Sequence, residues 1–244
     1  MNKLFLTLAI LFGIIFFREA HAKNYGLVIP DNWQNHAEFL NLKTSENLPA
    51  TFDWREKLGK EPEVLDQGSC GSCWAFSRVM AITWQNLIKG ATVTPAPQEL
   101  VSCDKQFFGC SGGFFSDYEV GGISNEVDFP YKAKNLRCKS GLPRQNKIVK
   151  WMFVGEENRP PSDAEVKQTI YQYGPVSATV AVVGRFPSGC GHGGTNHMIV
   201  LTGWNKTGWV MQNSWGKSWK EKGYATIQYG CYSIKETAAV PLLK

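Results

Sequence analysis

A glycine-rich loop runs directly into a helical pattern at Gln67-Gly68-Ser69-Cys70-Gly71-Ser72-Cys73-Trp74-Ala75-Phe76. The residues up to Lys89 repeat at helical spacing (Phe76, Met80, Thr83, Leu87), and Gly90 stands where such a helix ends. We therefore expect Cys73 in the first turn, where the helix dipole and free backbone N–H groups lower the pKa of a thiol. Cys70 lies three residues earlier, still in the loop. This makes Cys73 the candidate nucleophile and Cys70 the candidate half of a disulfide.

The cysteine count fits this division. The chain of 244 residues has 7 cysteines, and in an oxidising compartment an odd count predicts three disulfides and one free thiol. The first 22 residues indicate such a compartment, because Lys3, the 14 apolar residues 4–17 and the small-x-small site Ala20-His21-Ala22 form a secretory signal pattern. The alternative, a membrane anchor, needs about 20 apolar residues. We expect a mature chain from Lys23 that is secreted or lumenal (extracellular, periplasmic or in a lysosome- or vacuole-like compartment) and has no membrane association.

Composition excludes other classes of protein. Charged residues make up 19% and aromatic residues 13%, which is typical of a globular chain rather than a disordered one. The net charge of +5 is too small and too dispersed to predict nucleic-acid binding. One acid-free basic stretch covers residues 132–150; we interpret it as a solvated loop, with polyanion binding as the alternative.

Helical patterns come first along the chain and strand patterns second. Helices are predicted at about 33–42, 73–89, 98–102 and 163–173, the last with Ser162 as its cap and Gly174-Pro175 as its end. Strands are predicted at 51–54, 148–154, 176–183, 197–204, 208–212 and 223–229, and a disulfide-held loop follows residue 102 up to about 145. This order predicts an α+β protein of two lobes.

A thiol nucleophile needs a base from elsewhere in the chain. There are 4 histidines. His21 leaves with the signal peptide, His36 lies in the short N-terminal segment, and His192 lies in a glycine-rich loop. His197 begins an apolar strand that can hold its ring in place, and Asn213, at the end of the next strand, offers an amide to orient it.

At this point the sequence resembles the papain-like cysteine peptidases. The matching segments are Phe52-Asp53-Trp54-Arg55, residues 67–76, Gln98-Glu99-Leu100-Val101, Gly109-Cys110-Ser111-Gly112-Gly113, Asn196-His197 and Asn213-Ser214-Trp215-Gly216. Their order agrees with the family from about Leu48 onward. The resemblance implies a two-lobed fold, a helical lobe and a β-barrel-like lobe, with the active-site cleft between them.

The resemblance also implies roles. Cys73 is the nucleophile, His197 the base and then the acid, and Asn213 the residue that orients the imidazole. The Gln67 side chain and the backbone N–H of Cys73 are the two donors of the oxyanion hole. Trp215 covers the bond between Asn213 and His197. The implied disulfides are Cys70–Cys110, Cys103–Cys138 and Cys190–Cys231; from the sequence alone all pairings of these six stay open.

Substrate-binding residues follow from the same resemblance. Gly112 and Gly113 match a strand edge that pairs with substrate backbone. The pocket for the side chain two residues before the scissile bond maps to Phe114, Thr179, Thr195 and Glu236, with Asn196 and Trp215 beside the cleft. Glu236 predicts acceptance of Arg as well as large apolar residues there. The alternative is a solvated carboxylate paired with Lys235.

The resemblance implies a secreted endopeptidase that uses no metal or organic cofactor. Its expected partners are protein or peptide substrates and cystatin-like inhibitors, with no nucleic acid, and the expected state is a monomer. A redox Cys70/Cys73 pair would need a βαβ context that is missing, and zinc a second close cysteine pair. The rival function is a catalytically silent homologue that binds peptides or an inhibitor.

The domain plan departs from the family in one respect. Residues 23–47 number only 25, too few for the family's helical prosegment domain. Extended at about 3.4 Å per residue, they could still lie along a cleft. We therefore expect a signal peptide at 1–22, a short prosegment or extension at 23–47, and a peptidase domain at 48–244. Within that domain, residues 56–150 form the helical lobe, and 151–244 with 48–55 form the β-rich lobe.

Overall fold

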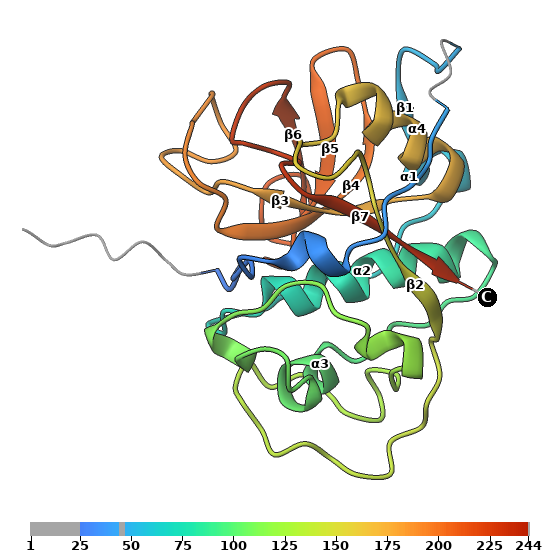
Figure 1. Cartoon of the computed structure of the whole chain (residues 1–244), viewed down its shortest axis with the longest axis vertical. Coiled ribbons are helices and arrows are strands. Elements are labelled where there is room, and N and C mark those ends of the chain that lie inside the picture. Colours follow the sequence, from blue (N-terminus) through green and yellow to red (C-terminus); the bar gives the residue numbers. More distant parts are fainter. Residues whose placement is uncertain (1–24, 44–46, 244) are drawn as a thin grey trace, which may run out of the picture.

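The computed structural model describes residues 25–43 and 47–243, so the predicted signal peptide lies outside the described residues. Figure 1 shows two lobes: strands and α4 above, α3 and long loops below, with α2 between them. The N-terminal segment, drawn in blue, crosses the molecule between the two lobes. The predicted two-lobed α+β architecture is therefore confirmed.

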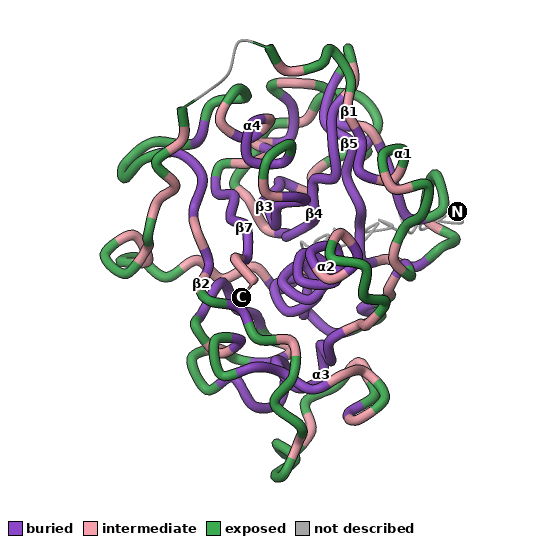
Figure 2. Tube along the Cα trace, turned by 90° about the vertical axis from the view of Figure 1, so that its right-hand side faces the viewer, coloured by how far each residue is buried: buried purple, intermediate pink, exposed green. Residues whose placement is uncertain are grey.

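The central helix is buried on almost every side. α2 spans Cys73–Ile88 and contacts β3, β4, β7 and α3. Figure 2 shows it as a buried element at the centre of the molecule. Its predicted bounds are correct within one residue, because the change from glycine-rich loop to helical pattern is sharp.

The helical lobe has little other regular structure. It contains α3 (Pro97–Cys103) and the 3-10 turns η2 (Gly109–Ser111) and η3 (Tyr118–Gly121). Helix α1 (Trp54–Leu58) lies in the other lobe, beside α4 and two of the strands (Figure 1). The long connection up to β2 is held by disulfides Cys70–Cys110 and Cys103–Cys138. The third disulfide, Cys190–Cys231, lies in the β-rich lobe, so all three are those that the resemblance implied.

The β-rich lobe is an antiparallel sheet. Its strands are β1 (Phe52–Asp53), β2 (Ile148–Phe153), β3 (Val176–Val180), β4 (His197–Trp204), β5 (Gly208–Gln212), β6 (Tyr224–Gln228) and β7 (Ala238–Leu243). Their order is β2-β7-β3-β4-β5-β6, and β1 pairs with β4. Among the described strands, β2 and β6 lie at the two ends of the sheet and do not pair with each other. The lobe expected to resemble a barrel is therefore an open sheet.

Helix α4 (Asp163–Tyr173) matches its predicted bounds because both ends carry strong signals. The Ser162 side chain accepts from the backbone N–H of Glu165, and the Glu165 carboxylate accepts from the backbone N–H of Ser162. This reciprocal pair satisfies two N–H groups that a helix start leaves unpaired. Gly174, at φ +113°, ends the helix.

One predicted element differs in type, and helix α1 and strand β7 were not predicted. The helix expected at 33–42 is a single 3-10 turn, η1 (Trp33–His36), after which Phe39 bridges to Phe153. Backbone pairing with β2 therefore replaces the rest of that helix. Strand β7 was not predicted, because alanines and Pro241 are poor strand signals; burial between β2 and β3 decides its conformation.

Of the helices within residues 25–43 and 47–243, none has the length and apolarity needed to cross a membrane.

Candidate active site

Cys73 opens α2 and is the one free cysteine of the described chain. Its side chain is wholly buried. Burial raises the pKa of the Cys73 thiol to about 12, although the backbone N–H groups of Met198, Trp74 and Cys73 itself act in the opposite direction. The lowered pKa expected at this helix start is therefore not found here, because desolvation outweighs the helix N-terminus.

His197 begins β4, the strand against which α2 packs. Its Nε2 lies 2.8 Å from Oδ1 of Asn213. An amide oxygen only accepts, so Nε2 carries the proton and Nδ1 is free to accept one. Nδ1 is buried without a hydrogen-bond partner in the described structure, and Trp215 stacks on the ring with centroids 4.9 Å apart. Burial lowers the pKa of His197 to about 4, although the hydrogen bond with Asn213 acts to raise it.

The two donors assigned to the oxyanion hole converge on one oxygen. Cys73 N–H and Gln67 Nε2 each donate to the carbonyl oxygen of Tyr25 at 3.2 Å. Gln67 is held by Ser214, whose hydroxyl donates to Oε1 at 2.7 Å, and by a bond from its Nε2 to the carbonyl oxygen of Cys70. A backbone carbonyl therefore lies where a substrate carbonyl would be polarised.

The residues after Tyr25 pair with the predicted substrate edge. The Gly113 N–H donates to the carbonyl oxygen of Gly26 at 2.9 Å, and the Val28 N–H donates to the carbonyl oxygen of Gly113 at 3.0 Å. Leu27 and Gly113 form a parallel bridge. The Tyr25 ring lies over the site, 5.1 Å from the His197 ring and 5.2 Å from that of Trp215. The segment 25–28 thus covers Cys73, His197 and Gly113.

Two glycines allow this close approach. A Cβ on Gly26, where φ is +107°, would lie 2.0 Å from the carbonyl oxygen of Gly71. A Cβ on Gly113 would lie 2.6 Å from the Trp74 ring. Neither position has room for a side chain, so both backbones reach the helix start closely.

The predicted pocket residues do not all line one cavity. Phe114 and Thr179 are buried, and Thr179 Oγ1 accepts from Thr237 N–H at 3.0 Å. Thr195 is half-buried, and Asn196 bonds with its side chain to both backbone groups of Val182.

Glu236 is exposed. Lys235 pairs instead with Asp163 at 3.1 Å, so the alternative partner of Glu236 is engaged elsewhere.

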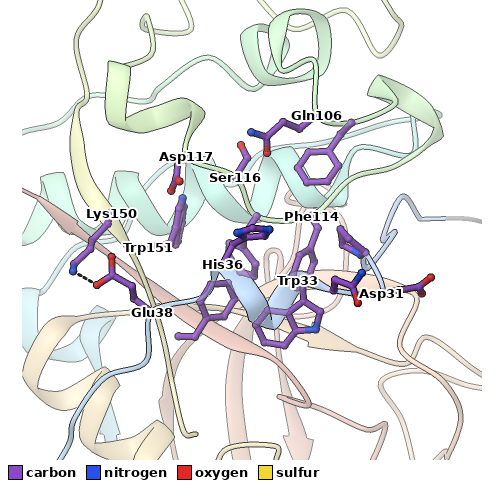
Figure 3. A pocket seen from close by; sticks show the side chains of 15 residues that line it. Asp31, Trp33, His36, Glu38, Gln106, Phe114, Ser116, Asp117, Lys150 and Trp151 are labelled. Atoms are coloured by element: carbon purple, nitrogen blue, oxygen red, sulfur yellow. Dashed lines mark hydrogen bonds and ion pairs between the residues drawn. The ribbon is translucent and has the colours of Figure 1, made fainter. Parts of the chain in front are cut away.

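Trp33 of the N-terminal segment stands between Phe114 and Glu236. It lines a cavity of about 800 Å³ together with Phe114 and Phe153, and one of about 410 Å³ together with Phe153 and Glu236. Figure 3 shows Trp33 and Phe114 in the larger cavity, with His36 and the Lys150–Glu38 ion pair on the same side of the segment. The Trp33 ring lies 4.7 Å from Phe153 and 5.5 Å, edge-on, from Phe114.

Sequence reasoning missed Tyr25 and Trp33 as parts of this site. Their one signal was aromatic residues within an otherwise polar segment. It did not show that the segment folds back over the cleft.

Comparison with known proteins agrees with the geometry. The family described as papain family cysteine protease matches residues 48–242. The chain belongs to the papain family of cysteine proteases. Cysteine proteinase COT44 of Brassica napus is 36% identical over 217 residues, covering 79% of this chain and 65% of that protein. Germination-specific cysteine protease 1 of Arabidopsis thaliana is 36% identical over 231 residues, covering 86% of this chain and 57% of that protein. The chain thus spans less than two thirds of these relatives.

Solved papain-family structures share the fold. Digestive procathepsin L2 of Tenebrio molitor superposes with a TM-score of 0.77 at 26% identity, covering 90% of this chain and 78% of that one. The Carica candamarcensis cysteine protease CMS1MS2, solved in complex with E-64, gives 0.71 at 29% identity and covers 81% of this chain and 100% of its own. The redox alternative fails, because Cys70 is bonded to Cys110 and not to Cys73.

Proposed function

We propose that this protein is a cysteine endopeptidase in which Cys73 is the nucleophile and His197 the base. The observation that carries the proposal is the convergence of Gln67 Nε2 and Cys73 N–H on a single carbonyl oxygen beside the buried thiol. Two preorganised donors at that position suit the oxyanion of a tetrahedral intermediate. The imidazole, with its proton fixed on Nε2 by Asn213, presents a free Nδ1 as a base.

In the proposed reaction the Cys73 sulfur attacks the scissile carbonyl carbon while its proton passes to His197 Nδ1. The carbonyl oxygen becomes an oxyanion held by Gln67 and the Cys73 N–H. The C–N bond then breaks as His197 returns the proton to the leaving amine, which leaves a thioester. Water attacks the thioester while giving a proton to His197; the C–S bond then breaks to release the acid, and His197 returns this proton to the Cys73 sulfur.

Labelling by an epoxide thiol probe tests this assignment. The chain from Lys23 should be labelled at Cys73, whereas Cys73→Ser should not react and His197→Ala should react at least about 10²-fold more slowly. If neither the wild-type chain nor Gly26→Ala, which should loosen the covering N-terminal segment, is labelled or hydrolyses peptides, the silent, peptide-binding homologue is favoured instead.

The N-terminal segment 25–43 is proposed to inhibit this site. In a substrate whose scissile carbonyl occupies the oxyanion hole, the residue paired with Gly113 precedes the scissile bond. Here the residues paired with Gly113 follow Tyr25, so the segment runs in the opposite direction. The strand edge at Gly113, which would pair with the substrate residues before the scissile bond, here pairs with residues that follow the Tyr25 carbonyl. This reversed direction suits a segment that is bound but not cleaved.

A glycine pair tests the inhibition. Gly26→Ala places a methyl group against the carbonyl of Gly71 and should speed epoxide labelling about 10-fold or more, since a clash in a close-packed contact costs roughly 1–3 kcal/mol. Gly90→Ala is the matched control, because Gly90 also has a positive φ, +87°, but has no atom within 4 Å of the added Cβ. Equal labelling rates in all three chains would overturn the inhibitory role.

Glu236 is proposed to admit Arg beside large apolar residues two positions before the scissile bond. The support is its exposed carboxylate, which lines a cavity with Trp33 and Phe153. While the N-terminal segment covers the cleft, the Trp33 ring lines the same cavity as Glu236. Phe-Arg and Arg-Arg reporter peptides should be cleaved at a ratio that shifts toward Phe-Arg in Glu236→Ala. An unchanged ratio contradicts the proposal.

We further propose that the protein is exported after removal of residues 1–22 and acts as a monomer on protein or peptide substrates. The three disulfides support an oxidising compartment. Cystatin-like inhibitors are the partners expected for the cleft once the N-terminal segment is displaced.

A further inference from the structure

Arg78 is a fully buried arginine on the helix that carries the nucleophile. It lies five residues after Cys73, about 7.5 Å further along the axis of α2. Its partners are Asp104 and Glu119, whose side chains are 2% and 0% exposed. Neither the catalytic assignment nor the disulfides account for a buried charge at this position.

The guanidinium uses all of its donors. Nε and Nη2 donate to the two carboxylate oxygens of Glu119, and Nη2 also donates to Ser116 Oγ at 2.7 Å. Nη1 donates to Asp104 Oδ2 at 3.1 Å. The fifth bond runs from Nη1 to the backbone carbonyl oxygen of Phe114 at 3.0 Å. A planar fork with five N–H groups is the one side chain that can fill this arrangement.

This fifth bond reaches the substrate edge itself. Phe114 follows Gly113, whose N–H and carbonyl pair with the N-terminal segment. Beneath Gly113 lies the Trp74 ring, and the Arg78 guanidinium stands 5.4 Å from that ring. The indole Nε1 of Trp74 donates to the carbonyl oxygen of Gly109 at 3.0 Å. The first two turns of α2 therefore support the edge from below through Trp74 and from one end through Arg78.

We propose that Arg78 is a positioning residue for the peptidase reaction: it ties the strand edge Gly112–Phe114 to the helix of Cys73 and so sets where a bound peptide lies relative to the sulfur. The inference rests on the proposed function. Asp104, Glu119 and Ser116 hold the guanidinium in one orientation, since each of its donors is engaged. A peptide paired with Gly113 then places its scissile carbonyl at a fixed distance from the thiol.

Lysine cannot replace this arginine. Its ammonium group has the same charge but offers three donors without a planar fork, so it cannot serve both carboxylates and the Phe114 carbonyl. Arg78→Lys therefore keeps the charge balance of the network while releasing the strand edge. A misplacement of about 1 Å at the reacting atoms can lower a rate about 10²-fold.

The test compares two substrates on the same preparation of the chain from Lys23. One is a Phe-Arg reporter peptide, which pairs with the strand edge; the other is an activated ester of a single acylated amino acid, which reaches only the residue next to the scissile bond. The ratio of their kcat/KM values cancels the fraction of molecules with a covered cleft. In Arg78→Lys this ratio should fall about 10-fold or more.

The matched control is Arg144→Lys in the same lobe. Arg144 pairs with the buried Glu99 but does not contact residues 112–114. In Arg144→Lys the ratio of kcat/KM for the Phe-Arg peptide to that for the ester should stay at the wild-type value. If Arg78→Lys does not fold, Arg78→Gln with Glu119→Gln removes one charge of each sign and should show the same fall.

The outcomes separate this inference from the proposed function. If neither the wild-type chain nor the uncovered variant Gly26→Ala cleaves either substrate, the proposed function is overturned. An active wild type with an unchanged ratio in the Arg78 variants, or with equal falls in the Arg144 control, overturns the positioning role alone.

Discussion

At the scale of single residues, the covered site stores its two reactive groups in neutral form. Burial raises the pKa of Cys73 to about 12 and lowers that of His197 to about 4. Near pH 7 both values favour a thiol and an uncharged imidazole. In the proposed reaction the thiolate is the nucleophile, so the proposed inhibition by segment 25–28 acts by excluding water as well as by occupying space.

Gln67 gives a direct test of the oxyanion hole. Gln67→Ala removes the Nε2 donor that now bonds to Tyr25, and kcat should fall about 10²–10³-fold with little change in KM. Ser214→Ala leaves Gln67 in place but removes its orienting bond, so its effect on kcat should be smaller. Steady-state kinetics on a reporter peptide measures both. A Gln67→Ala enzyme with wild-type kcat would contradict the assignment.

At the scale of elements, α4 shows how a charged cap responds to pH. The Arg159 side chain, followed by hydrogen bonds from Ser162, lowers the pKa of Glu165 to about 2 despite partial desolvation. A carboxyl whose pKa is lower when folded stabilises the fold above its ordinary value of 4.5, and this is lost as the pH falls toward 2.

Glu165→Gln tests this, because Gln keeps the reach of the capping box but not the charge. At pH 7 the variant should melt about 2–4 °C below wild type, and near pH 2 the two should melt together. Glu157→Gln, an exposed neighbour, is the control. Thermal unfolding followed by circular dichroism at both pH values measures the difference; a gap of the same size at pH 2 would show that the charge is not its cause.

Elements with strong local signals were predictable from the sequence, and those fixed by distant contacts were not. α2 and α4 have clear starts and ends, and the glycine-rich loop placed Cys73 at a helix N-terminus. β7 and the extended chain after His36 have weak local preferences and follow from pairing with β2. Tyr25 was missed for the same reason, since its position in the site depends on a fold-back of the whole segment.

At the scale of the whole molecule, the N-terminal segment contacts both sides of the cleft. It pairs with Gly113 in the helical lobe and, through Phe39, with Phe153 on β2. Trp33 joins these two contacts, since its ring packs on Phe39, Phe114 and Phe153. The buried core residues run from Trp54 to Val240, and the segment packs only partly buried side chains against them.

Trp33→Ala should therefore release the segment while the domain stays folded. Removing a large, partly buried aromatic ring costs roughly 2–4 kcal/mol of docking, so epoxide labelling of Cys73 should speed up at least about 10-fold. Phe108→Ala is the control, because that ring is 64% exposed on the same lobe. Hydrogen exchange gives a second readout: in Trp33→Ala the Gly113 and Val28 amides should exchange faster, while the amides of α2 stay protected. If the α2 amides lose protection to the same extent, Trp33 supports the core of the whole molecule and not the closure of its cleft.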